Sequence, residues 1–209
     1  MMALLIDHGI RSSLVLNAMA EVPRADFVLE DDRERAYDDR ALPIAARGQT
    51  ISQPLMVALV VEALELHPGD HALDVGTGSG YQAAVMAACG ANVVSIERIE
   101  TLAGEASERL RRLGYDVEVI VGDGSLGVPE RAPFDAIAVG AAAPRLPVSL
   151  ARQLAEGGRL VLPIADGPRG EELTRLRLVA GLWETESLGP CRFVPLIGAD
   201  GYEEAPLPD

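Results

Sequence analysis

The sequence feature that most constrains the fold is a glycine-rich turn between two apolar segments. Residues 72–75 have the apolar character of a short buried strand, and an apolar run with helical spacing begins at Tyr81. Between them stand Gly76, Gly78 and Gly80, separated by small polar residues. This order predicts the first half of a nucleotide-binding α/β unit. Glycines let the backbone pass close to a ligand, and the start of the helix offers unpaired N–H groups.

The spacing of the glycines indicates the kind of ligand. Dinucleotide-binding turns follow a G-x-G-x-x-G pattern, whereas here Asp74 is followed by G-x-G-x-G. An acid beside the turn disfavours a pyrophosphate and favours a cationic group. A second apolar segment, 92–96, ends in Glu97, at the position where doubly wound folds bind ribose hydroxyls. These features predict a site for S-adenosylmethionine, which carries a sulfonium and a nucleoside but no phosphate. The alternative is an ordinary βα turn without a ligand.

Composition narrows the classes of partner. The chain has 209 residues, which suits one domain. Its 18 basic residues, all arginine, stand against 32 acidic ones and give a net charge of −14. Such a surface repels phosphate backbones, so we expect no nucleic-acid partner. The sequence shows neither the pattern of a signal peptide nor an apolar run of membrane-spanning length. We therefore expect a cytoplasmic monomer without a membrane partner.

The cysteines and histidines predict no metal centre and no disulfide framework. The two cysteines are Cys89 and Cys191, and the three histidines are His8, His67 and His71, none at ligand spacing. Cys89 falls in an apolar helical run, where we expect it to be a small core residue.

From residue 70 onward, strand and helix patterns alternate, which predicts a parallel, doubly wound sheet. Before it, helical spacing covers 10–22, and Ser52 is the expected N-cap of a helix over 56–64 with Pro54 in its first turn. The expected parallel strands are 72–75, 92–96, 117–121, 134–139 and 159–163, and helices are expected over 101–113 and 146–154. Gly157 and Gly158 are expected to form a tight turn before the last of these strands. An antiparallel flap is expected from strands 172–179, 182–188 and 192–196.

We expect all 209 residues to form a single domain with three parts. An N-terminal helical cap and substrate segment takes 1–69, a cofactor-binding core takes 70–165, and C-terminal strands with a tail take 166–209.

Longer motifs resemble those of the protein-L-isoaspartate O-methyltransferases, a family of class I S-adenosylmethionine-dependent enzymes. The most specific are GQTISQP at 48–54 and FVPL at 193–196. Further matches are MAEVPRADF at 19–27, YDD at 37–39, LDVGTGSGYQAA at 73–84, SIER at 95–98, GDG at 122–124, APFDAI at 132–137 and QLAEGGRL at 153–160. Together they span nearly the whole chain.

The resemblance implies a Rossmann-like fold and a protein-repair activity. The family transfers a methyl group from S-adenosylmethionine to the α-carboxylate of L-isoaspartyl residues in damaged proteins and peptides, leaving S-adenosyl-L-homocysteine, and repair then proceeds through a succinimide. By position, Ser52 would be the catalytic residue and would contact the substrate with Val194, Pro195 and Leu196. The implied cofactor-binding residues are Gln49, Thr50, Ile51, Asp74, Gly76, Thr77, Gly78, Ser79, Gly80, Glu97, Arg98, Asp123 and Gly124.

Within that set, the resemblance implies separate parts of the cofactor for different residues. Asp74 and the glycines would shape the methionine end, and Glu97 would hold the ribose. Asp123 and Gly124 would meet the adenine. Two positions depart from the family pattern: Gly140 stands where members often carry Thr or Ser, and Val57 where some carry a polar residue.

Several alternatives remain open from the residues alone. Ser52 can cap a helix without taking part in catalysis, and Asp123 between two glycines can be a turn residue only. The same motifs fit a relative that methylates aspartyl or isoaspartyl residues while tailoring a dedicated peptide. They also fit a catalytically silent S-adenosylmethionine-binding module and, less well, a small-molecule methyltransferase.

Overall fold

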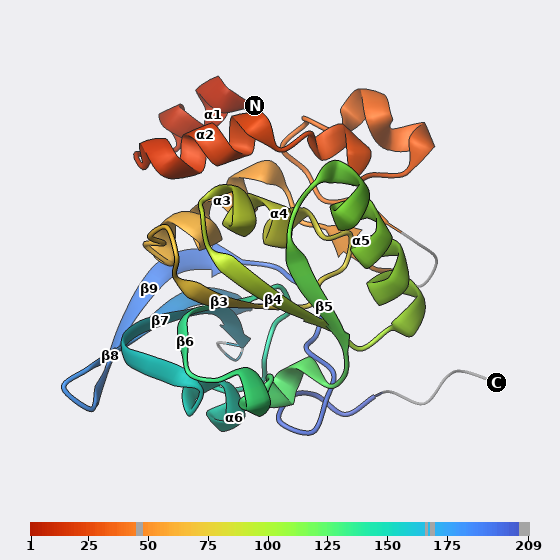
Figure 1. Cartoon of the computed structure of the whole chain (residues 1–209). Helices are drawn as coiled ribbons and strands as arrows, with labels where there is room; N and C mark the ends of the chain where they lie inside the picture. Colours follow the sequence, from red (N-terminus) through yellow and green to blue (C-terminus); the bar gives the residue numbers. More distant parts are fainter. Residues whose placement is uncertain (45–47, 166, 168–169, 205–209) are drawn as a thin grey trace.

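A single seven-stranded sheet forms the centre of the computed structural model, which describes residues 1–44, 48–165, 167 and 170–204. The strand order is β5 (Val117–Val121), β4 (Asn92–Glu97), β3 (His71–Val75), β6 (Phe134–Val139), β7 (Leu154–Ala165), β8 (Glu171–Val179) and β9 (Leu182–Cys191). The strands from β5 to β7 run parallel, and β8 and β9 are antiparallel additions. This arrangement confirms the predicted α/β fold. The C-terminal strands extend the same sheet, with their hairpin tip projecting from the body (Figure 1).

Helices cover both faces of the sheet. The helices α3 (Pro54–Ala63), α4 (Tyr81–Ala88) and α5 (Glu100–Leu113) lie on one side, and the short α6 (Val148–Ala151) lies on the other (Figure 1). The helices α1 (Met2–Asp7) and α2 (Ser13–Glu21) pack outside α3, and α2 also contacts α4. They form the predicted helical cap.

Between this cap and α3, the chain passes through two short 3-10 helices and a small hairpin. The 3-10 helices are Arg24–Asp26 and Glu30–Arg35, and the hairpin pairs β1 (Leu42–Pro43) with β2 (Thr50–Ile51) in antiparallel register. The hairpin carries Thr50 and leads directly into Ser52, two of the residues predicted to belong to the site.

Alternate residues of the strands supply two separate core layers. Ala72 and Val93 pack with the cap and with α3 and α4. Leu73 and Val94 pack on the opposite face with Leu150 of α6. Because the central strands are buried on both faces, their sequences read as continuous apolar runs.

Two expected elements near β7 are wrong. The helix predicted over 146–154 is only the single turn α6, since Leu154 has already entered β7 and pairs with Phe134 of β6. Gly157 and Gly158 do not form a tight turn before the strand. They lie inside β7, where the register against β6 shifts between Phe134 and Ala136, and Gly157 has a φ of +77°. A glycine-containing bulge accommodates this irregularity without ending the strand.

The strand predicted over 192–196 is also wrong. That segment leaves the sheet at the end of β9, and Pro195 makes only an isolated parallel bridge to Ala142. Proline has no N–H to donate to a ladder, so the segment cannot continue as a regular strand.

The start of α3 is capped differently from the prediction. Gln53, and not Ser52, is the N-cap, and Pro54 is the first helical residue. Asp39 accepts a 2.9 Å hydrogen bond from the backbone N–H of Leu55 and a 3.4 Å bond from the Gln53 amide. Because Asp39 satisfies an unpaired donor of the helix terminus, the Ser52 hydroxyl is not needed as a cap.

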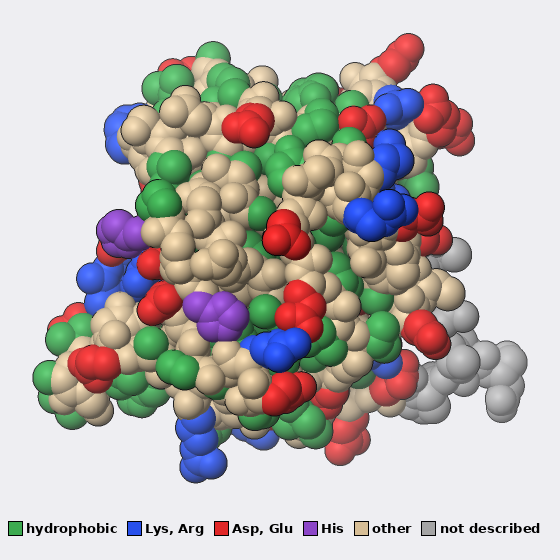
Figure 2. All heavy atoms as spheres, in the orientation of Figure 1, with side chains coloured by type: hydrophobic (Ala, Val, Ile, Leu, Met, Phe, Trp, Pro, Cys, Tyr) green, Lys and Arg blue, Asp and Glu red, His purple; other side chains and the backbone are tan. Residues whose placement is uncertain are grey.

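The surface reflects the acidic composition. Figure 2 shows acidic and basic side chains interspersed over several elements of one face, without a large basic patch there. Within the described ranges, no helix is both long enough and apolar enough to cross a membrane.

Candidate active site

The carboxyl ends of β3 and β6 mark the point where the strand order reverses. Sheets of this type bind ligands in the crevice at that point. Gly76 follows Val75 at the end of β3, and Gly140 follows Val139 at the end of β6. The Gly140 N–H donates a 2.8 Å hydrogen bond to the Val75 carbonyl. A Cβ on Gly140 would lie 3.4 Å from the backbone oxygens of Val75 and Gly76, so the two strand ends approach closely here.

Three adjoining cavities open at this edge of the sheet. The β4 cavity encloses about 630 Å³, the turn cavity about 360 Å³ and the outer groove about 1080 Å³. Thr50 and Gly140 line all three, and Ser52 lines both the turn cavity and the outer groove. The three spaces therefore meet beside the β2 hairpin strand and the end of β6.

The β4 cavity has mixed apolar and polar walls, with one carboxylate among them. It is lined by Ile44, Gln49, Thr50, Val75, Gly76, Gly78, Ile96, Glu97, Arg98, Ile99, Gly124, Gly140, Ala141, Val194, Pro195, Leu196 and Ile197. The carboxylate of Glu97 accepts hydrogen bonds of 3.0 Å from the N–H groups of Gly78 and Ile99. Each carboxylate oxygen has a second lone pair, so Glu97 ties the glycine turn to β4 and can still accept bonds from a ligand.

Two glycines of this cavity leave no room for a side chain. Gly78 has a φ of +53°, and a Cβ there would lie 3.3 Å from the side chain of Ile44. A Cβ on Gly124 would lie 2.7 Å from Val75, which is closer than packing allows. The backbone at both positions can therefore form the wall of a ligand site directly.

Asp74 lies beneath the glycine turn and does not line any of the three cavities. Its side chain is wholly buried and accepts 2.8 Å hydrogen bonds from the Gln82 amide and the Ser95 hydroxyl. The Ser95 hydroxyl lies 2.6 Å from that of Thr77. Burial raises the pKa of Asp74 to about 6; the two hydrogen bonds oppose the shift, and nearby Glu97 adds to it. Asp74 is therefore connected to the turn cavity by hydrogen bonds only, directly to Gln82 and through Ser95 to Thr77.

The turn cavity is closed on one side by an aromatic ring. Its walls are Thr50, Ile51, Ser52, Val57, Gly76, Thr77, Gly78, Ser79, Tyr81, Gln82 and Gly140. The guanidinium carbon of the buried Arg24 lies 4.9 Å from the Tyr81 ring centroid, and burial raises the pKa of Tyr81 to about 12. Phe27 packs edge-on against the same ring at 5.4 Å. These contacts fix Tyr81 at the start of α4.

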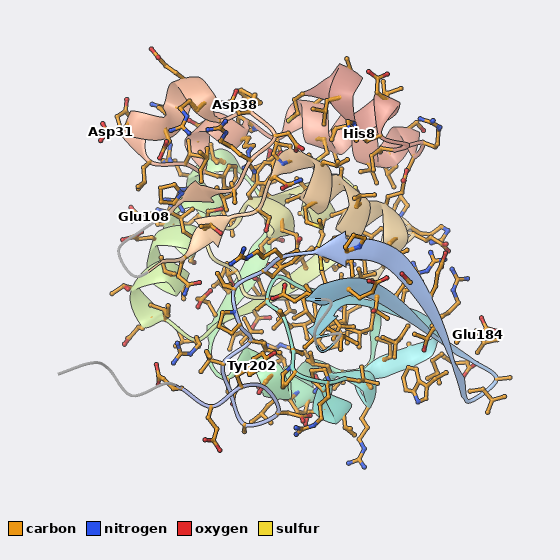
Figure 3. All side chains as sticks on the ribbon, turned by 180° about the vertical axis from the view of Figure 1, so that it is seen from behind. His8, Asp31, Asp38, Glu108, Glu184 and Tyr202 are labelled. Atoms are coloured by element: carbon orange, nitrogen blue, oxygen red, sulfur yellow. The ribbon has the colours of Figure 1, made fainter. Side chains whose placement is uncertain are left out.

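Asp123 and Gly124 have different positions, although the resemblance groups them. Gly124 lines the β4 cavity, whereas Asp123 does not. The Asp123 carboxylate accepts hydrogen bonds from the N–H and hydroxyl of Ser125, and one of 2.8 Å from the Ala199 N–H. Burial would raise the pKa of Asp123, but these hydrogen bonds outweigh it and hold the pKa below its usual value. Asp123 therefore fastens the C-terminal segment that carries Tyr202 (Figure 3).

Most predicted site residues come together around the three cavities. Gln49, Thr50, Gly76, Gly78, Glu97, Arg98 and Gly124 line the β4 cavity, and Ile51, Thr77 and Ser79 line the turn cavity. Of the predicted substrate residues, Ser52 and Val194 line the outer groove, whereas Pro195 and Leu196 line the β4 cavity. Asp74, Gly80 and Asp123 line none of them. Gly80 is the N-cap of α4, where a Cβ would lie 3.2 Å from Leu110.

Sequence reasoning missed several wall residues. Met56, Arg192 and Phe193 line the outer groove, and Ile44 and Ile99 line the β4 cavity. Phe193 opens the FVPL match, Arg192 directly precedes it, and Ile99 lies two residues beyond Glu97. Proximity to these motifs could have identified all three. Ile44 has no such signal, since the β1–β2 pairing brings it to the turn.

Comparisons with known proteins show which family the chain is similar to. A family model described as "Protein-L-isoaspartate(D-aspartate) O-methyltransferase (PCMT)" matches residues 1–201. A protein-L-isoaspartate O-methyltransferase of Roseiflexus castenholzii is 51% identical over all of this chain and 95% of the relative. Protein-L-isoaspartate O-methyltransferase 1 of Geotalea uraniireducens is 52% identical over 95% of this chain and 91% of the relative.

Two solved structures are similar over most of the chain. A protein-L-isoaspartate O-methyltransferase shares 30% identity with a TM-score of 0.86, covering 95% of this chain and 65% of that longer chain. A second structure, from Plasmodium falciparum, is described as a putative protein-L-isoaspartate O-methyltransferase in complex with S-adenosyl-L-homocysteine. It shares 30% identity with a TM-score of 0.81, and the match covers 94% of this chain and 96% of that chain.

Proposed function

Because the chain belongs to the protein-L-isoaspartate O-methyltransferase family, whose members use S-adenosylmethionine, we propose how its residues divide the work of methylating an L-isoaspartyl carboxylate. The observation that carries the proposal is the meeting of three cavities at Thr50 and Gly140, with Ser52 between two of them. The β4 cavity and the turn cavity would hold the methyl donor. The outer groove would hold the acceptor peptide.

The residues present fit S-adenosylmethionine. The β4 cavity combines apolar side chains with a few polar groups, among them the carboxylate of Glu97, which is the pattern of a small-molecule site. Glu97 would accept hydrogen bonds from ribose hydroxyls, and the bare backbone at Gly124 would lie against the adenine. When bound, S-adenosylmethionine supplies an electrophilic methyl group on a positively charged sulfur.

The methionine end would lie in the turn cavity. Thr77 and Gln82 line this space and are linked to the buried carboxylate of Asp74 directly or through Ser95. A buried negative charge close to the cavity favours a cationic ligand, because burial weakens the screening of that charge by water. Asp74 would therefore act through its field and by holding the turn, without touching the ligand.

Ser52 would orient the acceptor. A carboxylate with a pKa of roughly 3.5 to 4 is already ionised and nucleophilic at neutral pH, so the reaction needs no general base. The Ser52 hydroxyl would donate a hydrogen bond to one acceptor oxygen and direct the other toward the junction at Thr50 and Gly140. The apolar side chains of Met56 and Phe193 would exclude water from the groove.

A methylation assay with paired peptides tests this function. We expect transfer of a labelled methyl group from S-adenosylmethionine to a peptide that contains L-isoaspartate, and far less to the same peptide with normal aspartate. In an isoaspartyl link the free carboxylate hangs directly from Cα, and a displacement of about 1 Å can cost 10²-fold in rate. Equal rates would favour the peptide-tailoring alternative. Cofactor binding without methylation of either peptide would favour a silent binding module.

We further propose that the enzyme acts as a monomer in the cytoplasm on isoaspartyl proteins and peptides. The cysteines Cys89 and Cys191 are both free, as is usual in reducing compartments. Light scattering of the purified protein tests whether it is a monomer.

We also propose that the single domain has three parts, residues 1–69, 70–165 and 166–209.

A further inference from the structure

The outer groove has one charged side chain among the described residues that line it. That side chain is Arg192, and the remaining walls are apolar or neutral, with Met56, Pro190 and Phe193 as the larger ones. The chain as a whole carries a net charge of −14. A guanidinium in this place is therefore a local exception to the charge of the protein and not part of a general basic surface.

Arg192 is exposed and forms no ion pair within the described parts of the chain. Other exposed arginines do, such as Arg131 with Glu118 at 2.6 Å and Arg98 with Glu204 at 2.7 Å. Two acidic residues of β8, Glu171 and Glu172, lie near Arg192 because they pair with Cys191 and Pro190 of β9. Both carboxylates have hydrogen-bond partners other than Arg192. Glu171 accepts a 2.6 Å hydrogen bond from the Phe193 N–H, and Glu172 accepts one from the Ser187 hydroxyl. The Arg192 guanidinium thus remains available to a ligand in the groove.

The target carboxylate is not the natural partner of Arg192. That carboxylate has to reach the junction at Thr50 and Gly140. Arg192 lines the outer groove but neither of the other two cavities. Figure 3 shows the chain leaving β9 and descending toward the segment that carries Tyr202. The residues at the start of this path, Arg192 and Phe193, line the outer groove. A guanidinium bound to the reacting oxygen would also withdraw electron density from it and slow the reaction. Arg192 suits a second carboxylate.

We propose that Arg192 determines sequence preference, favouring isoaspartyl peptides with an acidic side chain within two residues of the isoaspartate. This inference rests on the proposed role of the outer groove as the acceptor site. An extended peptide advances about 3.3 Å per residue, so neighbouring side chains fall within reach of a long arginine side chain. Arg192 also offsets, near the groove, the repulsion that a strongly acidic enzyme exerts on acidic substrates.

The test uses isoaspartyl peptides in matched pairs that differ only by glutamate or glutamine at one position. Positions one and two residues before and after the isoaspartate are each tested, and kcat and KM are measured for both members. For at least one position, we expect the wild-type enzyme to have a KM about two- to five-fold lower for the glutamate peptide, the range of an exposed ion pair. The preference should fade in about 0.5 M salt, where charges are screened.

Two variants and a matched control identify the residue responsible. Arg192→Gln should abolish the glutamate preference, and Arg192→Glu should reverse it. The control is Arg152→Gln, because Arg152 is also exposed, forms no ion pair within the described residues and follows α6, away from the groove. Arg152→Gln changes the net charge by the same amount as Arg192→Gln, and it should keep the wild-type ratio of the two KM values. Since the readout is the ratio of two peptides within each variant, a general change in activity cancels.

The outcomes separate this inference from the proposed function. If the wild-type enzyme methylates the glutamine peptides but shows no glutamate preference at any position, the inference is wrong while the proposed function stands. The inference is equally wrong if Arg192→Gln keeps the preference or Arg152→Gln loses it. If the wild-type enzyme methylates no isoaspartyl peptide, the proposed function itself fails.

Discussion

The buried carboxylate of Asp74 accepts a 2.8 Å hydrogen bond from the hydroxyl of Ser95, the residue that stands opposite it in the pairing of β3 with β4. A second bond of 2.8 Å comes from Gln82. Burial nevertheless raises the pKa of Asp74 to about 6. The fold therefore keeps a costly negative charge directly under the glycine turn at neutral pH.

The first prediction concerns stability against pH. The folded state holds the Asp74 proton more tightly than the unfolded state, whose pKa is near 3.8. In the window from about pH 4 to pH 6, the contribution of Asp74 to the free energy of unfolding therefore falls as pH rises, by about 3 kcal/mol in total. We expect Asp74→Asn to gain stability relative to the wild type across this window in urea denaturation. Parallel pH profiles of the two proteins would contradict the prediction.

The second prediction separates the charge of the ligand from its shape. S-adenosylmethionine differs from S-adenosyl-L-homocysteine by one positively charged sulfonium methyl group. Loss of the Asp74 charge should therefore weaken S-adenosylmethionine about three- to ten-fold more than S-adenosyl-L-homocysteine, as expected for charges several ångströms apart. Calorimetric titration of Asp74→Asn with both ligands measures the difference. Equal losses would mean that Asp74 serves only to hold the turn.

The third prediction assigns ribose binding to Glu97. Hydrogen bonds to a charged group contribute about 1.5–3 kcal/mol each, so Glu97→Ala should weaken cofactor binding at least tenfold. Because both ligands carry the same ribose, S-adenosyl-L-homocysteine should also bind at least tenfold more weakly to this variant. The exposed Glu100, three residues further on, provides the control, and Glu100→Ala should bind normally. Unchanged affinity in Glu97→Ala would remove this residue from the site.

The fourth prediction concerns the chemical role of Ser52. Ser52→Ala should lower kcat by roughly 10- to 10³-fold through misalignment of the acceptor, with nearly unchanged cofactor affinity. Ser149→Ala, on α6, is the control. The wild-type rate should be nearly flat above about pH 7, since no required group titrates there. A wild-type rate in Ser52→Ala, together with a steep rise of the native rate with pH, would indicate a general base elsewhere.

The fifth prediction concerns the support beneath α3. The buried Arg159 donates hydrogen bonds to the carbonyls of Leu64 and Glu65 and pairs with Asp70 at 3.1 Å. Arg159→Leu would leave these acceptors without a partner and should cost about 2–4 kcal/mol of unfolding free energy. Arg131→Leu, which breaks a solvent-exposed pair, should cost much less. Similar losses in both variants would show that the α3 terminus does not depend on Arg159.

The sequence by itself determined the architecture and the place of the glycine turn between β3 and α4. The strands at 117–121 and 134–139 lie where the apolar runs predict them, and the helix closed by Gly114 ends as expected. These features are local, since strand propensity, apolar periodicity and glycine turns act over a few neighbouring residues. The G-x-G-x-G spacing after Asp74 is local in the same way.

Only the tertiary structure decided how the site residues divide their tasks. Asp39 caps α3 from outside it and leaves Ser52 to line the cavities. Asp123, predicted to meet the adenine, accepts a hydrogen bond from the backbone N–H of Ala199. These outcomes depend on contacts between residues far apart in the chain, where packing decides which of several possible partners a carboxylate meets. No local propensity specifies that choice, because a carboxylate at a turn has the same sequence pattern whether it binds a ligand or a distant N–H group.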